Sequence, residues 1–139
     1  MDIAVQEGAL TPPIFAGLRA ACGMTELEPS LIERAVKSSL FTLTAFSGAR
    51  AVGMVRVVGD GAFVFLIYDL LVVPLWRRRG IGSRLVETAI ARSKTFVPQG
   101  RAVVVSLFSA EGRESFYARL GFTELPAPGL GAGMQYICL

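Results

Sequence analysis

The sequence contains no histidine and only two cysteines, and these shortages exclude several kinds of site. Cys22 and Cys138 lie far apart, and neither belongs to a CxxC pair or a Cys/His cluster. A zinc site usually draws its ligands from closely spaced cysteines and histidines, and a catalytic triad usually needs a histidine base. We therefore expect no metal ion and no histidine-dependent nucleophile.

Long apolar runs and a secretory leader are also missing. The longest strongly apolar run near the middle, 62–68, is interrupted by Asp69, well short of the roughly 18 residues that a membrane span requires. The N-terminus lacks the basic start, apolar core and small-residue cleavage site of a signal peptide. The sequence thus predicts a cytoplasmic protein without a membrane partner.

The composition is that of one globular domain over residues 1–139. Of these residues, 53% are hydrophobic and only 18% are charged, which allows a substantial core. The net charge of +3 is mild, and the arginines concentrate in one short segment. A nucleic-acid binder would more often carry a broad basic face with interleaved aromatics. We therefore expect a small anion, not a nucleic acid, as the partner of this segment.

Hydrophobic periodicity predicts a mixed α/β order, with antiparallel strands first and βαβ units after them. The segment 102–108 is apolar on both faces, as is typical of the interior of a parallel sheet. Strands are expected at 3–6, 41–46, 51–58, 62–73, 102–108, 122–125 and 134–139. Helices are expected at 14–22, from 28 to about 40, from the glycine-rich stretch to Phe96, and at 111–120.

Three consecutive arginines and two glycines stand where the third strand gives way to a helical pattern. The residues are Arg77, Arg78, Arg79, Gly80, Ile81, Gly82 and Ser83. The first N–H groups of a helix are unpaired and carry the positive end of its dipole, so they bind anions. Glycines let a phosphate approach this backbone closely, and guanidinium groups grip its oxygens. The pattern favours a pyrophosphate, although spacing alone is equally compatible with an ordinary turn and solvated arginines.

Two other phosphate-binding motifs fit this segment poorly. The dinucleotide-binding fingerprint needs a third glycine where this chain has Leu85. A P-loop needs Gly-Lys followed by Ser or Thr, and the segment contains no such run.

Two motifs resemble those of the GNAT superfamily of N-acetyltransferases. The run from Arg77 to Gly82 is similar to its Arg/Gln-x-x-Gly-x-Gly/Ala signature, and "FYARLGF", from Phe116 to Phe122, resembles its helix-to-strand element. Both occur in the family's order, about forty residues apart. In detail the chain is similar to small bacterial GNAT proteins that are related to plant chloroplast serotonin and protein acetyltransferases.

The resemblance implies the GNAT fold: a mixed, mostly antiparallel central sheet flanked by helices, with two parallel strands that splay apart. It implies that acetyl-CoA binds in this wedge as a co-substrate. Its pantetheine would pair with the strand that contains Leu70, Leu71 and Val72. Its pyrophosphate would lie on the N–H groups of residues 78–83, with the arginine side chains less predictable.

The resemblance also implies catalytic residues. Tyr117 matches the position of the general acid that protonates the departing thiolate, and a phenol has suitable donor chemistry. Asp69 is the candidate base, because a carboxylate inside an apolar strand needs an explanation. A structural carboxylate bonded to backbone or to Arg56 is an equal alternative. Tyr68 should point to the opposite face of the strand unless a bulge intervenes.

The implied activity is direct acetyl transfer to an amine in a ternary complex, and the alternative is a CoA-binding regulatory module without turnover. The acceptor stays open among arylalkylamines, polyamines, amino acids, antibiotics and protein amines. The apolar last strand, 134–139, and the frequency of dimers among GNAT relatives predict a homodimer.

Overall fold

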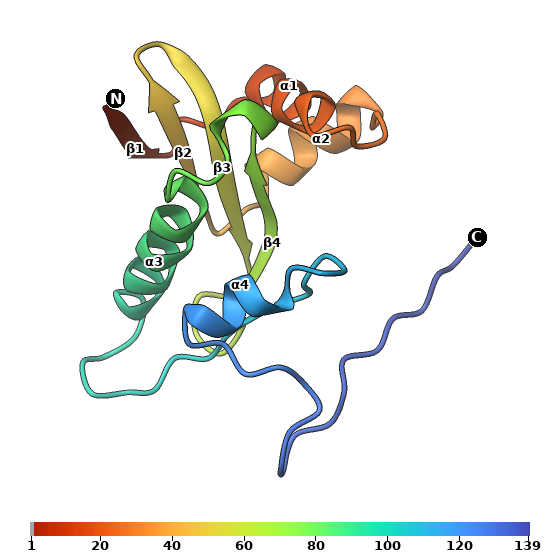
Figure 1. Cartoon of the computed structure of the whole chain (residues 1–139). Helices are drawn as coiled ribbons and strands as arrows, with labels where there is room; N and C mark the ends of the chain where they lie inside the picture. The colour runs from red at the N-terminus through yellow and green to blue at the C-terminus, as the bar shows by residue number, and fades with distance from the viewer. Residues whose placement is uncertain (1) are drawn as a thin grey trace. The chain divides into compact units, whose positions relative to one another are not determined.

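A computed structural model describes residues 2–139, which form two compact units. The first unit ends at Leu107, and the second runs from Phe108 to Leu139. Figure 1 shows the chain coloured from the N-terminus to the C-terminus. No helix in the described range is both long and apolar enough to cross a membrane.

The first unit is built on a five-stranded sheet with the order β1-β2-β3-β4-β5. The first four strands pair in antiparallel fashion, whereas β5 is parallel to β4. The sheet therefore confirms the expected mixed, mostly antiparallel arrangement. The strands are β1 (Ile3–Glu7), β2 (Phe41–Ser47), β3 (Arg50–Val58), β4 (Phe65–Val72) and β5 (Val105–Leu107).

Helices lie on both faces of this sheet (Figure 1). On one face, Phe15 and Leu18 of α1 and Ile32 of α2 are buried in one cluster with Met54 and Val73. On the other face, α3 buries a separate apolar stripe (Ile81, Leu85, Val86 and Ala89). The helices are α1 (Pro12–Ala21), α2 (Pro29–Lys37), the 3-10 turn η1 (Pro74–Trp76), α3 (Ile81–Lys94) and, in the second unit, α4 (Glu114–Arg119).

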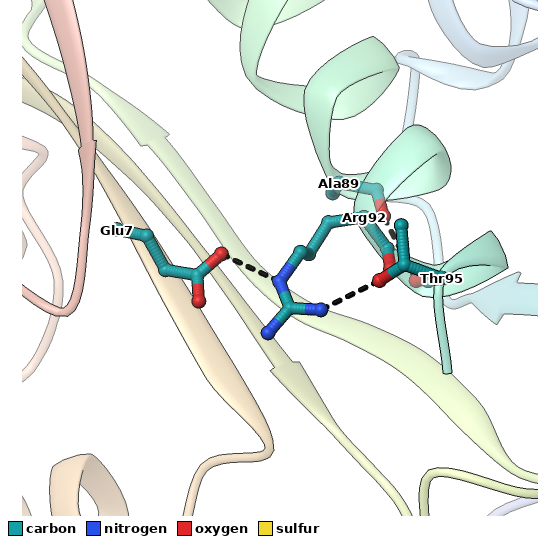
Figure 2. Close-up of polar contacts among 5 residues, drawn as sticks. Glu7, Ala89, Arg92 and Thr95 are labelled. Atoms are coloured by element: carbon teal, nitrogen blue, oxygen red, sulfur yellow. Dashed lines mark hydrogen bonds and ion pairs between the residues drawn. The ribbon is translucent and has the colours of Figure 1, made fainter.

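Two arginines of α3 fasten the helix to β1. Arg92 donates from Nε to the carboxylate of Glu7 at 2.8 Å and from Nη1 to the hydroxyl of Thr95 at 2.6 Å (Figure 2). Near the other end of the helix, Arg84 donates to the backbone oxygen of Ile3 at 2.6 Å. The ion pair is about 40% exposed (38% and 42% for the two side chains) and contributes little stability, but both contacts fix the position of α3.

The predicted strand from residue 62 is too long at its start, because β4 begins only at Phe65. The carboxylate of Asp60 accepts hydrogen bonds from the N–H groups of Ala62, Phe63 and Val64, each at 2.8 Å. These N–H groups are therefore used in a tight loop instead of a ladder. The same bonds lower the pKa of Asp60 below its ordinary value.

The later strand predictions are also partly wrong. The expected strand 102–108 shortens to β5, because β4 pairs with it only over Phe65–Ile67. The expected strands 122–125 and 134–139 do not form, since no strand follows β5 in the described residues. The second unit has only an isolated bridge between Ala127 and Leu130. A β-prone segment forms a ladder only when another strand pairs with it, and sequence pattern alone does not report such a partner.

Candidate active site

The parallel ladder of β4 and β5 is only three residues long, because β5 ends at Leu107. Phe65–Ile67 of β4 pair with Val105–Leu107 of β5, and the ladder ends there. β4 continues to Val72 and is paired over this second half with β3 alone among the strands of the first unit. The edge of residues 68–72 that faces away from β3 is therefore not covered by a strand.

Alternation along β4 identifies the backbone groups at this open edge. The N–H of Val73 donates to Val52 of β3 at 2.9 Å, so Leu71, two residues earlier, also directs its polar groups toward β3. Leu70 and Val72 then direct theirs to the open side. Leu71 thus differs from the other two residues expected to pair with the cofactor. Its backbone groups pair with β3, and its side chain packs against the core cluster.

The carbonyl of Val72 already has two donors in this structure. Arg77 donates from Nε at 2.9 Å, and the thiol of Cys22, at the end of α1, lies 3.6 Å away. The first arginine of the cluster is thus folded back onto the strand that precedes it. The contact of Cys22 could not be found from the sequence, because 50 positions separate it from Val72.

The loop from β4 to α3 turns through two left-handed residues. Arg78 has φ 62° and Gly80 has φ 78°, and α3 begins directly afterwards at Ile81. A left-handed conformation suits glycine but costs a non-glycine residue about 1–2 kcal/mol. The chain therefore accepts strain at Arg78 to bring the start of α3 to the end of β4.

The N-terminus of α3 has the properties of an anion site. Its N-cap, Gly80, has no side chain that could accept the first N–H groups of the helix. Ile81 is buried and anchors the first turn, whereas Gly82 and Ser83 are partly accessible. Uncapped N–H groups and the helix dipole together favour a negatively charged ligand. A pyrophosphate fits these residues.

The remaining arginines differ in their surroundings, although all three of the cluster are exposed. The guanidinium carbon of Arg79 lies 4.9 Å from the ring centre of Trp76, a cation–π distance. Trp76 is itself partly buried against the core cluster. Arg78 is exposed on the strained turn and adds positive charge beside the helix start.

Asp69 forms a buried ion pair with Arg56. Its Oδ2 lies 2.8 Å from Nε of Arg56, and the two side chains are 7% and 12% exposed. Nη1 of Arg56 also donates to the backbone oxygen of Ala35 in α2 at 3.3 Å. Arg56 is therefore the partner that was expected if Asp69 is a structural carboxylate. The carboxylate lies on the face of the sheet that α1 and α2 cover.

A β-bulge brings Tyr68 to the same cation. Arg56 is opposite Asp69 while Val57 is opposite Ile67, so Tyr68 is the extra residue of β4. The guanidinium carbon of Arg56 lies 5.8 Å from the Tyr68 ring centre. Tyr68 and Asp69 thus both contact Arg56, although consecutive residues of a regular strand would point to opposite faces. The sequence contains no signal that locates this bulge.

Tyr117 lies in α4 of the second unit. Its ring is half-buried and makes edge-to-face contacts with Phe116 and Phe122 at centroid distances of 5.0 and 5.8 Å. Burial raises the pKa of the phenol above its ordinary value, and the nearby Arg113 lowers it to a smaller extent. The phenol is therefore protonated at neutral pH and available as a proton donor.

The described residues contain no group of three or more His, Cys, Asp or Glu side chains that could hold a metal ion.

Comparison with protein families identifies one matching model. The model for the acetyltransferase (GNAT) domain matches residues 38–124, which is more than half of the chain. The matched range begins just before β2 and ends after α4, so it contains both motifs on which the resemblance rests.

Solved structures support the same relationship. A GNAT-family acetyltransferase from Streptococcus pneumoniae is 30% identical, with 99% of this chain and 98% of that chain covered and a TM-score of 0.83. A protein of unknown function from meticillin-resistant Staphylococcus aureus, titled a probable acetyltransferase, is 28% identical, with coverage of 99% and 100% and a TM-score of 0.84.

Plant proteins are similar over part of their length. A Glycine max protein named histone acetyltransferase TAP1 is 29% identical over 109 residues, which cover 74% of this chain and 46% of that protein. GCN5-related N-acetyltransferase 2, chloroplastic, of Arabidopsis thaliana is 34% identical over 77 residues, covering 55% and 28%. The chain spans less than half the length of these relatives. They confirm the resemblance to plant acetyltransferases.

Proposed function

Because this chain belongs to the GNAT acetyltransferase family, we propose that it transfers an acetyl group from acetyl-CoA directly to a primary amine while both substrates are bound. One observation carries the proposal. Beyond Ile67, one edge of β4 has no strand partner. The chain then continues through a short loop to the N-terminus of α3, which has no side-chain cap. An extended amide-containing arm and a pyrophosphate are the ligand parts that these two features would hold.

The residues for acetyl-CoA follow from this arrangement. The N–H and C=O of Leu70 and the N–H of Val72 are proposed to bind the amides of the pantetheine arm, because the carbonyl of Val72 already accepts from Arg77 and Cys22. The N–H groups of residues 81–83 are proposed to bind the pyrophosphate, with the exposed charge of Arg78 beside them. When bound, acetyl-CoA supplies a thioester whose carbonyl carbon accepts the amine.

The acceptor amine must lose a proton, because alkylamines have a pKa near 10 and only the neutral form has a lone pair. Asp69 is the proposed base. Arg56 engages its Oδ2, so the proton would go to Oδ1, directly or through a water molecule. As the amine nitrogen bonds to the carbonyl carbon, the carbon–sulfur bond breaks and the thiolate leaves.

Tyr117 is the proposed donor to that thiolate. Burial raises the pKa of its phenol, which keeps the proton on the oxygen until a strong base is formed nearby. The phenolate then takes the second proton that the amine nitrogen loses as the amide forms, directly or through water, and Asp69 releases its proton to solvent.

A second candidate is a CoA-binding module without turnover. The ion pair between Arg56 and Asp69 favours it, because the pair gives this buried carboxylate a structural role that requires no catalysis. The open edge of β4 and the start of α3 would bind CoA in either case.

Thiol release from acetyl-CoA separates the two functions. The assay uses a panel of arylalkylamines, polyamines, amino acids, aminoglycosides and peptides, with a sample without amine as the control. The enzyme should give amine-dependent release, and mass spectrometry should find one acetyl group on the amine. CoA binding without amine-dependent release for any class would support the binding module.

A further inference from the structure

The three consecutive arginines before α3 differ in what their side chains contact. Nε of Arg77 donates to the backbone oxygen of Val72 at 2.9 Å. The guanidinium carbon of Arg79 lies 4.9 Å from the ring centre of Trp76. Within residues 2–139, the side chain of Arg78 has no hydrogen-bond or ion-pair partner. The two outer arginines are thus folded back onto the chain that precedes them, and the middle one keeps its charge free.

Few backbone hydrogen bonds hold the loop 77–80 in the part of the chain that the structure describes. Its first N–H donates to Pro74 at 3.2 Å, and the next such bond, from Arg84 to Gly80 at 3.0 Å, already belongs to the start of α3. Between these two bonds the backbone is left-handed at Arg78 and Gly80. A strained conformation persists only when its surroundings hold it in place. The side-chain bond from the loop to β4 supplies such a hold.

The carbonyl that Arg77 uses lies at the open edge of β4, because Val72 directs its polar groups away from β3. The open edge and the N-terminus of α3 are the two features proposed to hold acetyl-CoA, and this loop connects them. A site whose parts are already in place binds more tightly than one that must be ordered on binding. Arg77 is therefore placed to set the position of one part relative to the other.

We propose that Arg77 is a positioning residue of this site and not a ligand of the pyrophosphate. Its Nε–H holds the loop at Val72, which keeps the first N–H groups of α3 at the end of the open edge, and its positive charge is not required. The inference rests on the proposed function, because it concerns the acetyl-CoA site. The side chain is exposed, so its bond should act on the loop and contribute little to global stability.

Two neutral substitutions separate a positioning donor from a charged ligand. In Arg77→Gln, the amide nitrogen follows Cδ as Nε does in arginine, so an N–H donor is kept while the charge is lost. In Arg77→Met, a methyl group takes that place, so both the donor and the charge are lost. Arg50→Met removes a charge from an exposed position of β3 and is the matched control.

Calorimetric titration of CoA compares these four proteins. Wild type, Arg77→Gln and Arg50→Met should bind with similar affinity, whereas Arg77→Met should bind at least about fivefold more weakly. All four should have similar melting temperatures. Equal weakening in both Arg77 variants would show that the charge binds the phosphate and would overturn the proposal. Equal affinity in all four proteins would show that Arg77 does not position the site.

NMR relaxation without CoA tests the loop separately from the proposed function. The order parameters of the backbone N–H groups of residues 78–83 should stay near wild type in Arg77→Gln and fall in Arg77→Met. Unchanged order parameters in Arg77→Met would overturn the positioning role, whether or not CoA binds. If they fall as expected but wild type does not bind CoA, Arg77 holds the loop as inferred and the proposed function is wrong.

Discussion

Arg56 and Asp69 face each other across β3 and β4 and form an ion pair of 2.8 Å that is almost completely buried. The same guanidinium group reaches Ala35 of α2, so the pair connects the sheet with a helix. Removing one partner of a buried pair leaves the other charge uncompensated, which typically costs about 3–5 kcal/mol. Asp69 therefore stabilises the fold, whether or not it also accepts a proton.

Substitutions on the two sides of this pair should have different effects on turnover. Asp69→Asn and Arg56→Gln both remove the ion pair and should lower the free energy of unfolding by similar amounts. If Asp69 is the base, only Asp69→Asn should also lower kcat, by about 10²-fold or more, in protein shown to be folded. Equal loss of kcat in the two variants would assign Asp69 a purely structural role.

Gly53 should not tolerate a side chain, because α3 packs against it. A Cβ at this position would lie 3.0 Å from the backbone oxygen of Leu71 and 3.4 Å from side-chain carbons of Ile81 and Leu85. Gly53→Val should therefore destabilise the protein by about 1–3 kcal/mol, measured by urea unfolding. Gly17→Ala is the matched control: nothing lies within 4 Å of its Cβ, and alanine in a helix should add about 0.5–1 kcal/mol. A neutral Gly53→Val would contradict the close packing of α3.

The sequence predicts those elements whose causes are local. The strands β2 and β3 follow from two β-prone runs that are close in the sequence, and the start of α3 follows from the glycine-rich stretch before it. The start of β4 was misplaced because the Asp60 carboxylate takes three N–H groups that a strand would use. The C-terminal strands were misplaced because a strand also depends on a neighbouring edge, which no local pattern reports.

The candidate site shows the same division. The helix start beside Gly82 was predicted, because a glycine-rich helix start is encoded in consecutive residues; phosphate binding there stays a prediction. The bulge at Tyr68 was not, since its register depends on the pairing of two strands. The contact of Cys22 with Val72 joins segments whose proximity only the fold determines.

The raised pKa of Tyr117 should be visible in alkaline stability. The folded protein holds this phenolic proton above the ordinary pKa of 10.0, whereas the unfolded chain releases it there. The corresponding stability is fully present below pH 10 and is lost as pH rises through the folded pKa. Wild type should therefore lose more stability than Tyr117→Phe as the pH rises above about 10. Parallel pH profiles would show that the phenol is not desolvated.

The catalytic role of the same hydroxyl is tested by turnover at neutral pH. Tyr117→Phe keeps the ring contacts with Phe116 and Phe122 and removes only the oxygen. If Tyr117 protonates the thiolate, kcat should fall by about 10²-fold or more, while Tm and CoA affinity stay close to wild type. Full turnover on an accepted amine would remove this assignment.

The proposed pyrophosphate site at the start of α3 is tested most directly by calorimetric titration of CoA into wild type, Gly82→Asp and Ala91→Asp. Aspartate in the first turn of a helix is favourable, so Gly82→Asp should fold, but its carboxylate would stand at the proposed pyrophosphate site. Ala91→Asp makes the same charge change on an exposed position farther along α3. CoA should bind Gly82→Asp at least about tenfold more weakly than wild type, or ~1.4 kcal/mol, and should bind Ala91→Asp with near wild-type affinity. Equal CoA affinity in all three folded proteins would show that the pyrophosphate does not lie at the start of α3.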